Sequence, residues 1–167
     1  MMLKQTIAAL LLLATSYAKT PRPIANVGIN MGDGKKQLLT AYKGKVVLFA
    51  IMATTCDHCL ASLAFLDKLQ KEYGAKGFQA VVAIGDENAP FMLVPFKQRY
   101  KLSLPVGYLT KEEMQKIGDI PLDKRPFVPI YMFIDRTGTV KFQYYGDDPF
   151  FNDEVRATTV IVQNLLR

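Results

Sequence analysis

Residues 46–59 read VVLFAIMATTCDHC and hold the pattern that decides the fold. The first part, Val46–Met52, is a continuous apolar run of strand length, which is typical of a central strand buried on both faces. Cys56-Asp57-His58-Cys59 follows it and contains both cysteines and the only histidine of the chain. Apolar residues then recur at helical spacing over residues 60–73. The sequence therefore predicts a strand that delivers two cysteines to the start of a helix.

The first residues have the order of a secretory signal. Lys4 gives a positive start, residues 7–14 form an apolar run, and Ser16-Tyr17-Ala18 offers a small-x-small cleavage site. An amphipathic or buried first helix is the alternative, whereas a membrane anchor is disfavoured because spanning needs about 20 apolar residues. We expect a signal peptide at residues 1–18, one domain over residues 19–167, and an exported protein of the bacterial periplasm.

The cysteine spacing favours chemistry over structural cross-linking. Export implies an oxidising compartment in which disulfides persist. Cys56 and Cys59 would close a loop too short to remove much entropy from the unfolded chain. One histidine and two cysteines also fall short of the four ligands of structural zinc, so we expect no metal. The net charge of +6 is spread over scattered basic residues, which does not favour nucleic-acid binding.

The rest of the chain alternates between strand and helix patterns. A kink or break is expected at Pro95, and Thr110 with Glu113 forms a predicted capping box. The expected elements are a buried strand at 78–85, a helix at 89–100, a short strand at 104–109, a helix at 111–117, a hairpin of 130–134 with 139–145, and a closing helix at 152–166. This order predicts an α/β fold with a central mixed sheet and helices on both faces.

The position of Cys56 predicts an acidic thiol. Unpaired N–H groups and the positive end of the helix dipole favour its thiolate, and a nearby His58 imidazolium adds to this. Asp57 opposes the effect because it is a like charge. We expect the pKa of Cys56 to lie below the free-cysteine value of about 8.5. Cys56 then attacks a disulfide and Cys59, one helical turn on, resolves the mixed disulfide.

A second motif, residues 125–129 (RPFVP), directly precedes the hairpin. With it, the chain resembles the thioredoxin superfamily, and within it the exported TlpA/ResA-like thiol–disulfide oxidoreductases. The matching stretches are residues 42–48, 53–59, 84–87 and 128–138. The resemblance implies a thioredoxin-like fold with an N-terminal extension and a helix–strand insertion. It also implies thiol- or disulfide-bearing proteins as partners, no cofactor, a monomer, and membrane contact only through a redox partner.

The same resemblance makes Pro129 a cis-proline that faces the dithiol. A trans proline at the start of a strand is the alternative. The backbone of Val128 is then free to pair with an extended substrate peptide as an added strand. The expected site is therefore Cys56, Cys59, His58 and Pro129, with Val128 and Pro129 binding substrate.

The chain departs from the family pattern around the motif. Ala50 stands where thioredoxins place a buried acid, and Ser62 stands where ResA-like proteins carry a glutamate. Met52 and Thr55 stand where tryptophans are common. The proton acceptor for Cys59 must then come from water, from within the motif, or from a neighbouring loop. Asp86 and Glu87 are the loop candidates, with helix capping as their alternative role.

Three other functions remain open on the sequence. A peroxiredoxin shares the fold family, but Ala53 and Phe49 replace the threonine and proline of its cysteine motif. A Cu(I) carrier would use Cys56, Cys59 and His58, with Met52 as a further soft ligand. A non-catalytic binding domain would explain the missing acid and tryptophans.

Overall fold

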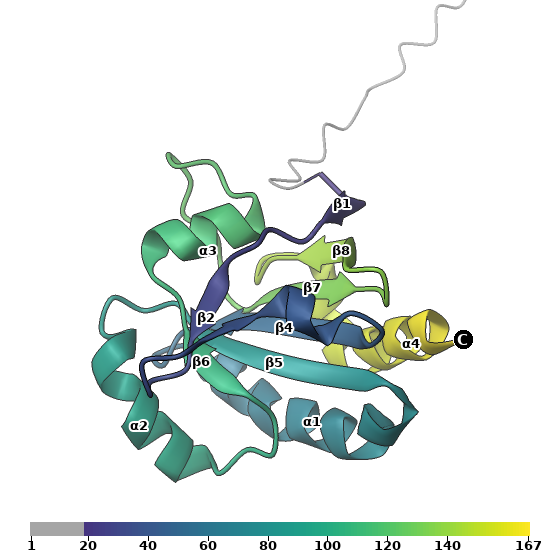
Figure 1. Ribbon diagram of the computed structural model, residues 1–167, viewed down its shortest axis with the longest axis horizontal. Coiled ribbons are helices and arrows are strands. Elements are labelled where there is room, and N and C mark those ends of the chain that lie inside the picture. Colours follow the sequence, from purple (N-terminus) through teal and green to yellow (C-terminus); the bar gives the residue numbers. More distant parts are fainter. Residues whose placement is uncertain (1–18) are drawn as a thin grey trace, which may run out of the picture.

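The computed structural model describes residues 19–167, so the expected signal peptide lies outside the described residues. This range folds into strands and helices around one sheet (Figure 1). The strands are β1 (Arg22–Pro23), β2 (Gly28–Asn30), β3 (Lys36–Leu38), β4 (Val46–Met52), β5 (Phe78–Ile84), β6 (Val106–Tyr108), β7 (Ile130–Ile134) and β8 (Thr139–Tyr144). The helices are α1 (Asp57–Tyr73), α2 (Ala89–Tyr100), α3 (Lys111–Gly118) and α4 (Glu154–Leu166), with short 3-10 helices η1 (Leu39–Tyr42), η2 (Gly74–Lys76) and η3 (Pro149–Asp153).

The described strands form one mixed sheet in the order β1-β8-β7-β4-β5-β6-β2-β3. β4 lies inside it, parallel to β5 and antiparallel to β7. Every residue of β4 and β5 is buried, as their continuous apolar runs predicted. The register places Ala50 of β4 between Val82 and Tyr131. This pairing fixes which side chains lie under the start of α1.

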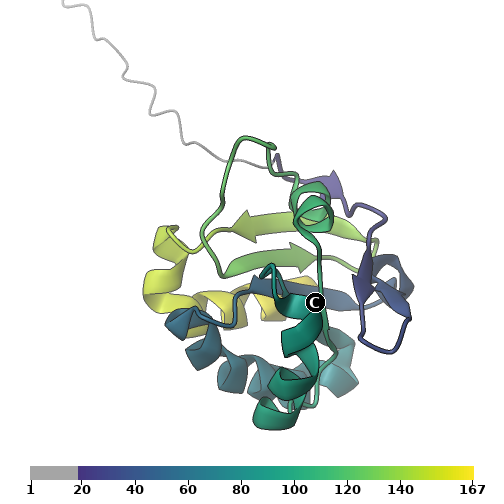
Figure 2. The same ribbon diagram turned by 90° about the vertical axis from the view of Figure 1, so that its left-hand side faces the viewer.

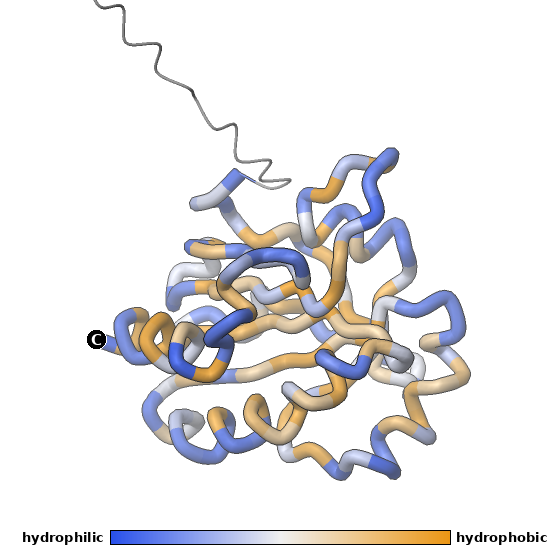
Figure 3. Tube along the Cα trace, turned by 180° about the vertical axis from the view of Figure 1, so that it is seen from behind, coloured by the Kyte–Doolittle hydropathy of each residue, from blue (hydrophilic) through white to orange (hydrophobic). Residues whose placement is uncertain are grey.

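Helices cover both faces of the sheet, as expected. The side chains of α1, α2 and α4 pack with one face, and those of α3 and η1 pack with the other. Figure 2 shows α3 on one side of the strands and α1 and α2 on the other. The hydropathy colouring places the apolar segments in the central strands and the hydrophilic ones mostly in loops and outer helix turns (Figure 3). None of the helices within residues 19–167 has the length and apolar character needed to cross a bilayer.

The sequence patterns placed most elements correctly. The hairpin β7–β8 forms as predicted, and the capping box at Thr110 and Glu113 is present at the start of α3. α1 begins at Asp57, earlier than the apolar periodicity indicated, because Cys56 caps it. The closing helix begins at Glu154, and the residues before it form η3.

Of the kink or break expected at Pro95, the break is wrong. α2 is assigned as one helix from Ala89 to Tyr100. Pro95 deprives the carbonyl of Phe91 of its helical donor, but both residues are exposed, so water can satisfy that carbonyl. The buried side of the helix, Leu93 and Phe96, anchors it to the core.

Candidate active site

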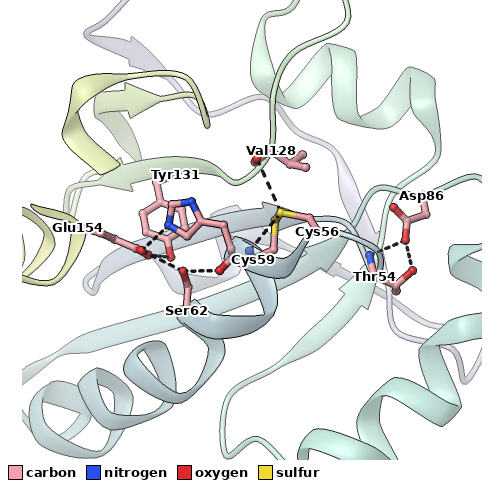
Figure 4. Close-up of a disulfide and its surroundings, with 9 residues drawn as sticks. Thr54, Cys56, Cys59, Ser62, Asp86, Val128, Tyr131 and Glu154 are labelled. Carbon is pink, nitrogen blue, oxygen red and sulfur yellow. Dashed lines mark hydrogen bonds and ion pairs between the residues drawn. A yellow bond between two sulfur atoms is a disulfide. The ribbon is translucent and has the colours of Figure 1, made fainter. Parts of the chain in front are cut away.

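The two cysteines lie where β4 meets α1 and are joined in a disulfide. Cys56 is the N-cap of α1, and its Sγ accepts a hydrogen bond from the Cys59 N–H at 3.1 Å. Cys56 is partly exposed, whereas Cys59 is 0% exposed. A thiol or disulfide arriving from solvent therefore reaches the sulfur of Cys56 first. Figure 4 shows the disulfide between the two cysteines, with Val128 next to Cys56.

The helix start favours negative charge on Cys56. α1 is 17 residues long, and its first N–H groups have no partner within the helix. The bond from Cys59 N–H is one such group directed at the Cys56 sulfur. Together with the helix dipole, it stabilises a thiolate at this position once the disulfide is reduced. Asp57 is exposed in the first turn, where solvent screens its opposing charge.

The second motif lies next to the dithiol, because it directly precedes β7, which pairs with β4. The Val128–Pro129 peptide bond is cis, and the carbonyl oxygen of Val128 lies 3.9 Å from Cys56 Sγ. Pro129 is buried, while Val128 is partly exposed. The cis-proline expected at Pro129 is therefore present and lies beside the dithiol, while peptide pairing with the backbone of Val128 stays a prediction.

Gly146 holds this segment in place from behind. Its N–H donates to the carbonyl of Phe127 at 3.0 Å. A Cβ at Gly146 would collide with the carbonyl of Val128 and would lie 3.2 Å from the nitrogen of Pro129. Only glycine permits this approach, so Gly146 belongs to the site although the sequence analysis did not select it.

His58 turns toward α4. Its Nε2 lies 2.9 Å from Oε2 of Glu154, and its ring packs edge-on against Phe151 with centroids 5.4 Å apart. The histidine was expected to act directly on Cys56. The contact that the structure gives it is with a carboxylate from the last helix, 96 residues along the chain.

Glu154 is the functional candidate that the sequence analysis missed. Its carboxylate accepts hydrogen bonds from the hydroxyls of Ser62 (3.0 Å) and Tyr131, in addition to the contact with His58. The pKa of Tyr131 is raised well above its usual value, mainly because the side chain is buried and secondly because of the negative charge of Glu154. Tyr131 is therefore a neutral donor at physiological pH. The only signal in the sequence was an acidic residue in the first turn of the closing helix.

Asp86 supports the loop in front of the dithiol. Its Oδ2 accepts hydrogen bonds from the N–H (2.6 Å) and the hydroxyl (2.5 Å) of Thr54. These bonds tie the end of β5 to the segment that precedes Cys56 (Figure 4). Glu87 is exposed. The contacts thus assign Asp86 to the shape of the loop rather than to Cys59.

The described residues contain no group of three or more His, Cys, Asp or Glu side chains arranged to hold a metal ion. This arrangement belongs to the oxidised form, in which the sulfurs of Cys56 and Cys59 are bonded to each other.

Comparisons with known proteins agree with this geometry. A family model described as Redoxin matches residues 21–161. The thiol-disulfide oxidoreductase ResA of Bacillus thuringiensis subsp. konkukian is 28% identical over 116 residues, which are 69% of this chain and 63% of the relative. The thioredoxin-like protein YneN of Bacillus subtilis is 36% identical over 77 residues, 44% of each chain. The chain thus spans less than two thirds of the length of the ResA protein it matches.

Solved structures share the fold. A thiol:disulfide interchange protein of the thioredoxin family from Chlorobium tepidum superposes with a TM-score of 0.70 at 23% identity, covering 90% of this chain and 99% of that one. A DsbF homologue from Corynebacterium diphtheriae gives a TM-score of 0.70 at 13% identity, covering 87% of this chain and 88% of the other. These likenesses confirm the predicted thioredoxin-like fold.

Proposed function

The chain belongs to the Redoxin family, and on that premise we propose that it is an exported thiol–disulfide oxidoreductase that exchanges disulfides with partner proteins. One observation carries the proposal. A partly exposed Cys56 caps α1 beside the partly exposed Val128, and a buried Cys59 is bonded to it. This is the geometry that a two-cysteine exchange reaction requires.

The exchange proceeds in two steps. The Cys56 thiolate attacks one sulfur of a partner disulfide, a Cys56–partner bond forms, and the other partner sulfur leaves with the electron pair as a thiolate. Cys59 then loses its proton and attacks Cys56 Sγ. The Cys56–Cys59 bond forms, the bond to the partner breaks, and the partner is released as its second thiolate. The partner gains two electrons and the protein dithiol loses them, and the same steps in reverse oxidise a partner.

The helix start and the loop at Val128 have separate tasks in this scheme. The N–H of Cys59 and the dipole of α1 hold Cys56 as a thiolate, which is the attacking species. The backbone of Val128 aligns an extended partner segment with the sulfur. We expect the pKa of Cys56 in the reduced protein to lie below about 8.5. An absorbance titration of the thiolate measures it, and a value at or above that of a free cysteine would contradict this role.

The decisive experiment is trapping. Cys59→Ser removes the resolving thiol, so partner proteins should accumulate on Cys56 as mixed disulfides that run as larger species until a reductant is added. Cys56→Ser is the matched control and should trap little, because the remaining Cys59 is buried. If Cys56→Ser traps partners and Cys59→Ser does not, the roles are reversed. If neither variant forms mixed disulfides, the exchange function is wrong.

Export is part of the same proposal. Residues 1–18 supply the signal, and cleavage after Ala18 leaves Lys19 as the first residue. Intact mass measurement of the protein recovered from a bacterial periplasm should give the mass of residues 19–167. Recovery of the uncleaved chain from the cytoplasm alone would contradict export.

A further inference from the structure

The carboxylate of Glu154 is held in an unusually well-defined place. Its side chain is 11% exposed, and its three hydrogen-bonding partners are His58, Ser62 and Tyr131. Two partners come from α1 and one from β7, so Glu154 joins the last helix to the elements of the dithiol (Figure 4). Both carboxylate oxygens are used, which explains how a charged group is tolerated at this depth.

Aromatic rings pack against two of the residues that bind this carboxylate. The ring of Phe151 lies edge-on to His58 at 5.4 Å and to Tyr131 at 5.2 Å, and Phe150 stacks on Tyr144 at 4.1 Å. The Glu154 side chain itself is only 11% exposed, so its hydrogen-bonding partners offer the route between the carboxylate and solvent. Of these, His58 is the one with access to solvent, because its side chain is 42% exposed.

Ser62, a partner of the carboxylate, shares a helix face with the buried cysteine. Cys59 and Ser62 are three residues apart in α1, which places them on one face of the helix, and they are 0% and 4% exposed. The hydroxyl of Ser62 lies 3.0 Å from Oε2 of Glu154 and 3.0 Å from the carbonyl oxygen of His58, so its one proton is shared between two acceptors. A hydroxyl can accept one proton while it gives up another, so Ser62 is a suitable link between a thiol and a carboxylate.

The other acids near the motif are placed differently. Asp86 is bound to Thr54, and Asp57 is exposed to solvent. Ala50, which lies opposite Tyr131 in the sheet, has no acidic group to offer. The titratable groups that face the Glu154 carboxylate are His58 from α1 and Tyr131 from β7.

We propose that Glu154 is the proton-accepting residue for Cys59 and works through Ser62. This inference rests on the proposed exchange function. In the resolving step the proton of the Cys59 thiol passes to Ser62 while the hydroxyl proton of Ser62 passes to Glu154. The Cys59 thiolate then forms its bond to Cys56, and the partner leaves as a thiolate with the electron pair of the broken bond. Glu154 is left protonated and returns the proton to solvent through His58.

The test separates the two steps of exchange. A peptide labelled with a fluorophore is loaded on Cys56 of the full domain as a mixed disulfide, and its release is followed by stopped flow between pH 5 and 9. Glu154→Gln keeps the shape of the side chain but not the base. It should slow release at pH 7 by about 10- to 100-fold, since general-base catalysis contributes about 10²- to 10⁴-fold. The deficit should shrink as the pH approaches the range in which a free thiol ionises unaided.

A second variant guards against a merely structural effect. Ser62→Ala leaves the carboxylate in place but removes the link, so it should slow release in the same way. The first step, measured as attack by Cys56 in a Cys59→Ser background, should change by less than about 3-fold with either substitution. A slowing of both steps to the same extent, or no slowing of release, overturns the inference.

Thr158 provides the matched control. It lies one turn after Glu154 on the buried side of α4, and its hydroxyl finds no hydrogen-bond partner within residues 19–167. Thr158→Val should therefore leave the release rate and its pH profile unchanged. If the parent protein never forms the mixed disulfide, the exchange function itself fails. If the parent protein forms and resolves it and Glu154→Gln does so at the same rate, only the role of Glu154 fails.

Discussion

Replacing Gly146 by alanine perturbs the substrate-facing backbone without touching either cysteine. The added Cβ would collide with the carbonyl group of Val128 and would lie 3.2 Å from the nitrogen of Pro129. These are backbone atoms, so no change of rotamer relieves the contact. The segment at Val128 must therefore move. In the parent protein the carbonyl oxygen of Val128 lies 3.9 Å from Cys56 Sγ. The substitution therefore shifts the backbone that aligns a partner relative to the sulfur that reacts.

Two magnitudes follow from this contact. Overpacking in a filled interior costs about 1–3 kcal/mol in the free energy of unfolding. For a domain of this size each kcal/mol lowers the melting temperature by about 2–4 °C, so we expect a loss of about 2–12 °C. A misplacement of about 1 Å in a reacting geometry can cost about 100-fold in rate. We therefore expect reaction with a peptide disulfide to slow by about 10- to 100-fold.

The assay compares two substrates of the reduced protein. One is an extended peptide that carries a disulfide and can pair with the backbone of Val128. The other is a small symmetric disulfide reagent, which needs no such pairing and should react with Gly146→Ala at nearly the parental rate. The peptide reaction alone should be slowed.

Gly34→Ala is the matched control. Gly34 has φ +79°, and a Cβ there would meet no atom within 4 Å, so alanine costs backbone strain of about 1 kcal/mol without changing the site. It should lower the melting temperature yet react with both substrates at parental rates. If Gly146→Ala keeps full stability and full reactivity, or if both variants slow the peptide reaction equally, the proposed role of the Gly146 contact is refuted.

Three further substitutions test the hydrogen bonds that stabilise the loop before the dithiol, the start of α3 and the turn at Asp135. Asp86→Ala removes the acceptor of two hydrogen bonds in the loop before the dithiol and should cost about 1–3 kcal/mol in urea unfolding, whereas the exposed Glu87→Ala should stay within about 0.5 kcal/mol. Thr110→Ala removes half of the capping box with Glu113 and should cost about 0.5–2 kcal/mol in the same measurement; no loss would contradict the cap. Burial tends to raise the pKa of Asp135, but hydrogen bonds from its turn outweigh this and hold the pKa below its usual value. Its stabilisation is therefore present above about pH 3.9 and is lost as the pH falls through the folded-state pKa, so Asp135→Asn should flatten the acid branch of unfolding free energy against pH, and an unchanged branch would contradict it.

The parts of the fold that were predictable depend on local patterns. The runs Val46–Met52 and Phe78–Ile84 are apolar throughout because both faces of these strands are covered, and that leaves a signal in the sequence. The turn after β7 and the cap of α3 each depend on a few adjacent residues, so the sequence predicts them as well. Pro95 shows the limit, because whether a helix tolerates proline depends on the exposure of the carbonyl left without a donor.

The site was predictable only where its chemistry is contiguous. Cys56 and Cys59 are adjacent on one turn, and the resemblance supplied the second motif at Pro129. Glu154 could not be found in this way, because its contact with His58 spans 96 residues and depends on how α4 packs. Gly146 was missed for a similar reason. The need for glycine there comes from the backbone of Val128 and Pro129, which reaches Gly146 only when the hairpin folds.

The contact between His58 and Glu154 also sets an order of events during synthesis. The chain emerges from its N-terminus, so the dithiol, β4 and α1 exist before the residue that completes their polar surroundings, 96 positions later. A growing chain that has not yet released α4 carries both cysteines without the carboxylate of Glu154 or the rings of Phe150 and Phe151. The polar contacts of His58, Ser62 and Tyr131 are thus complete only once the last helix has docked.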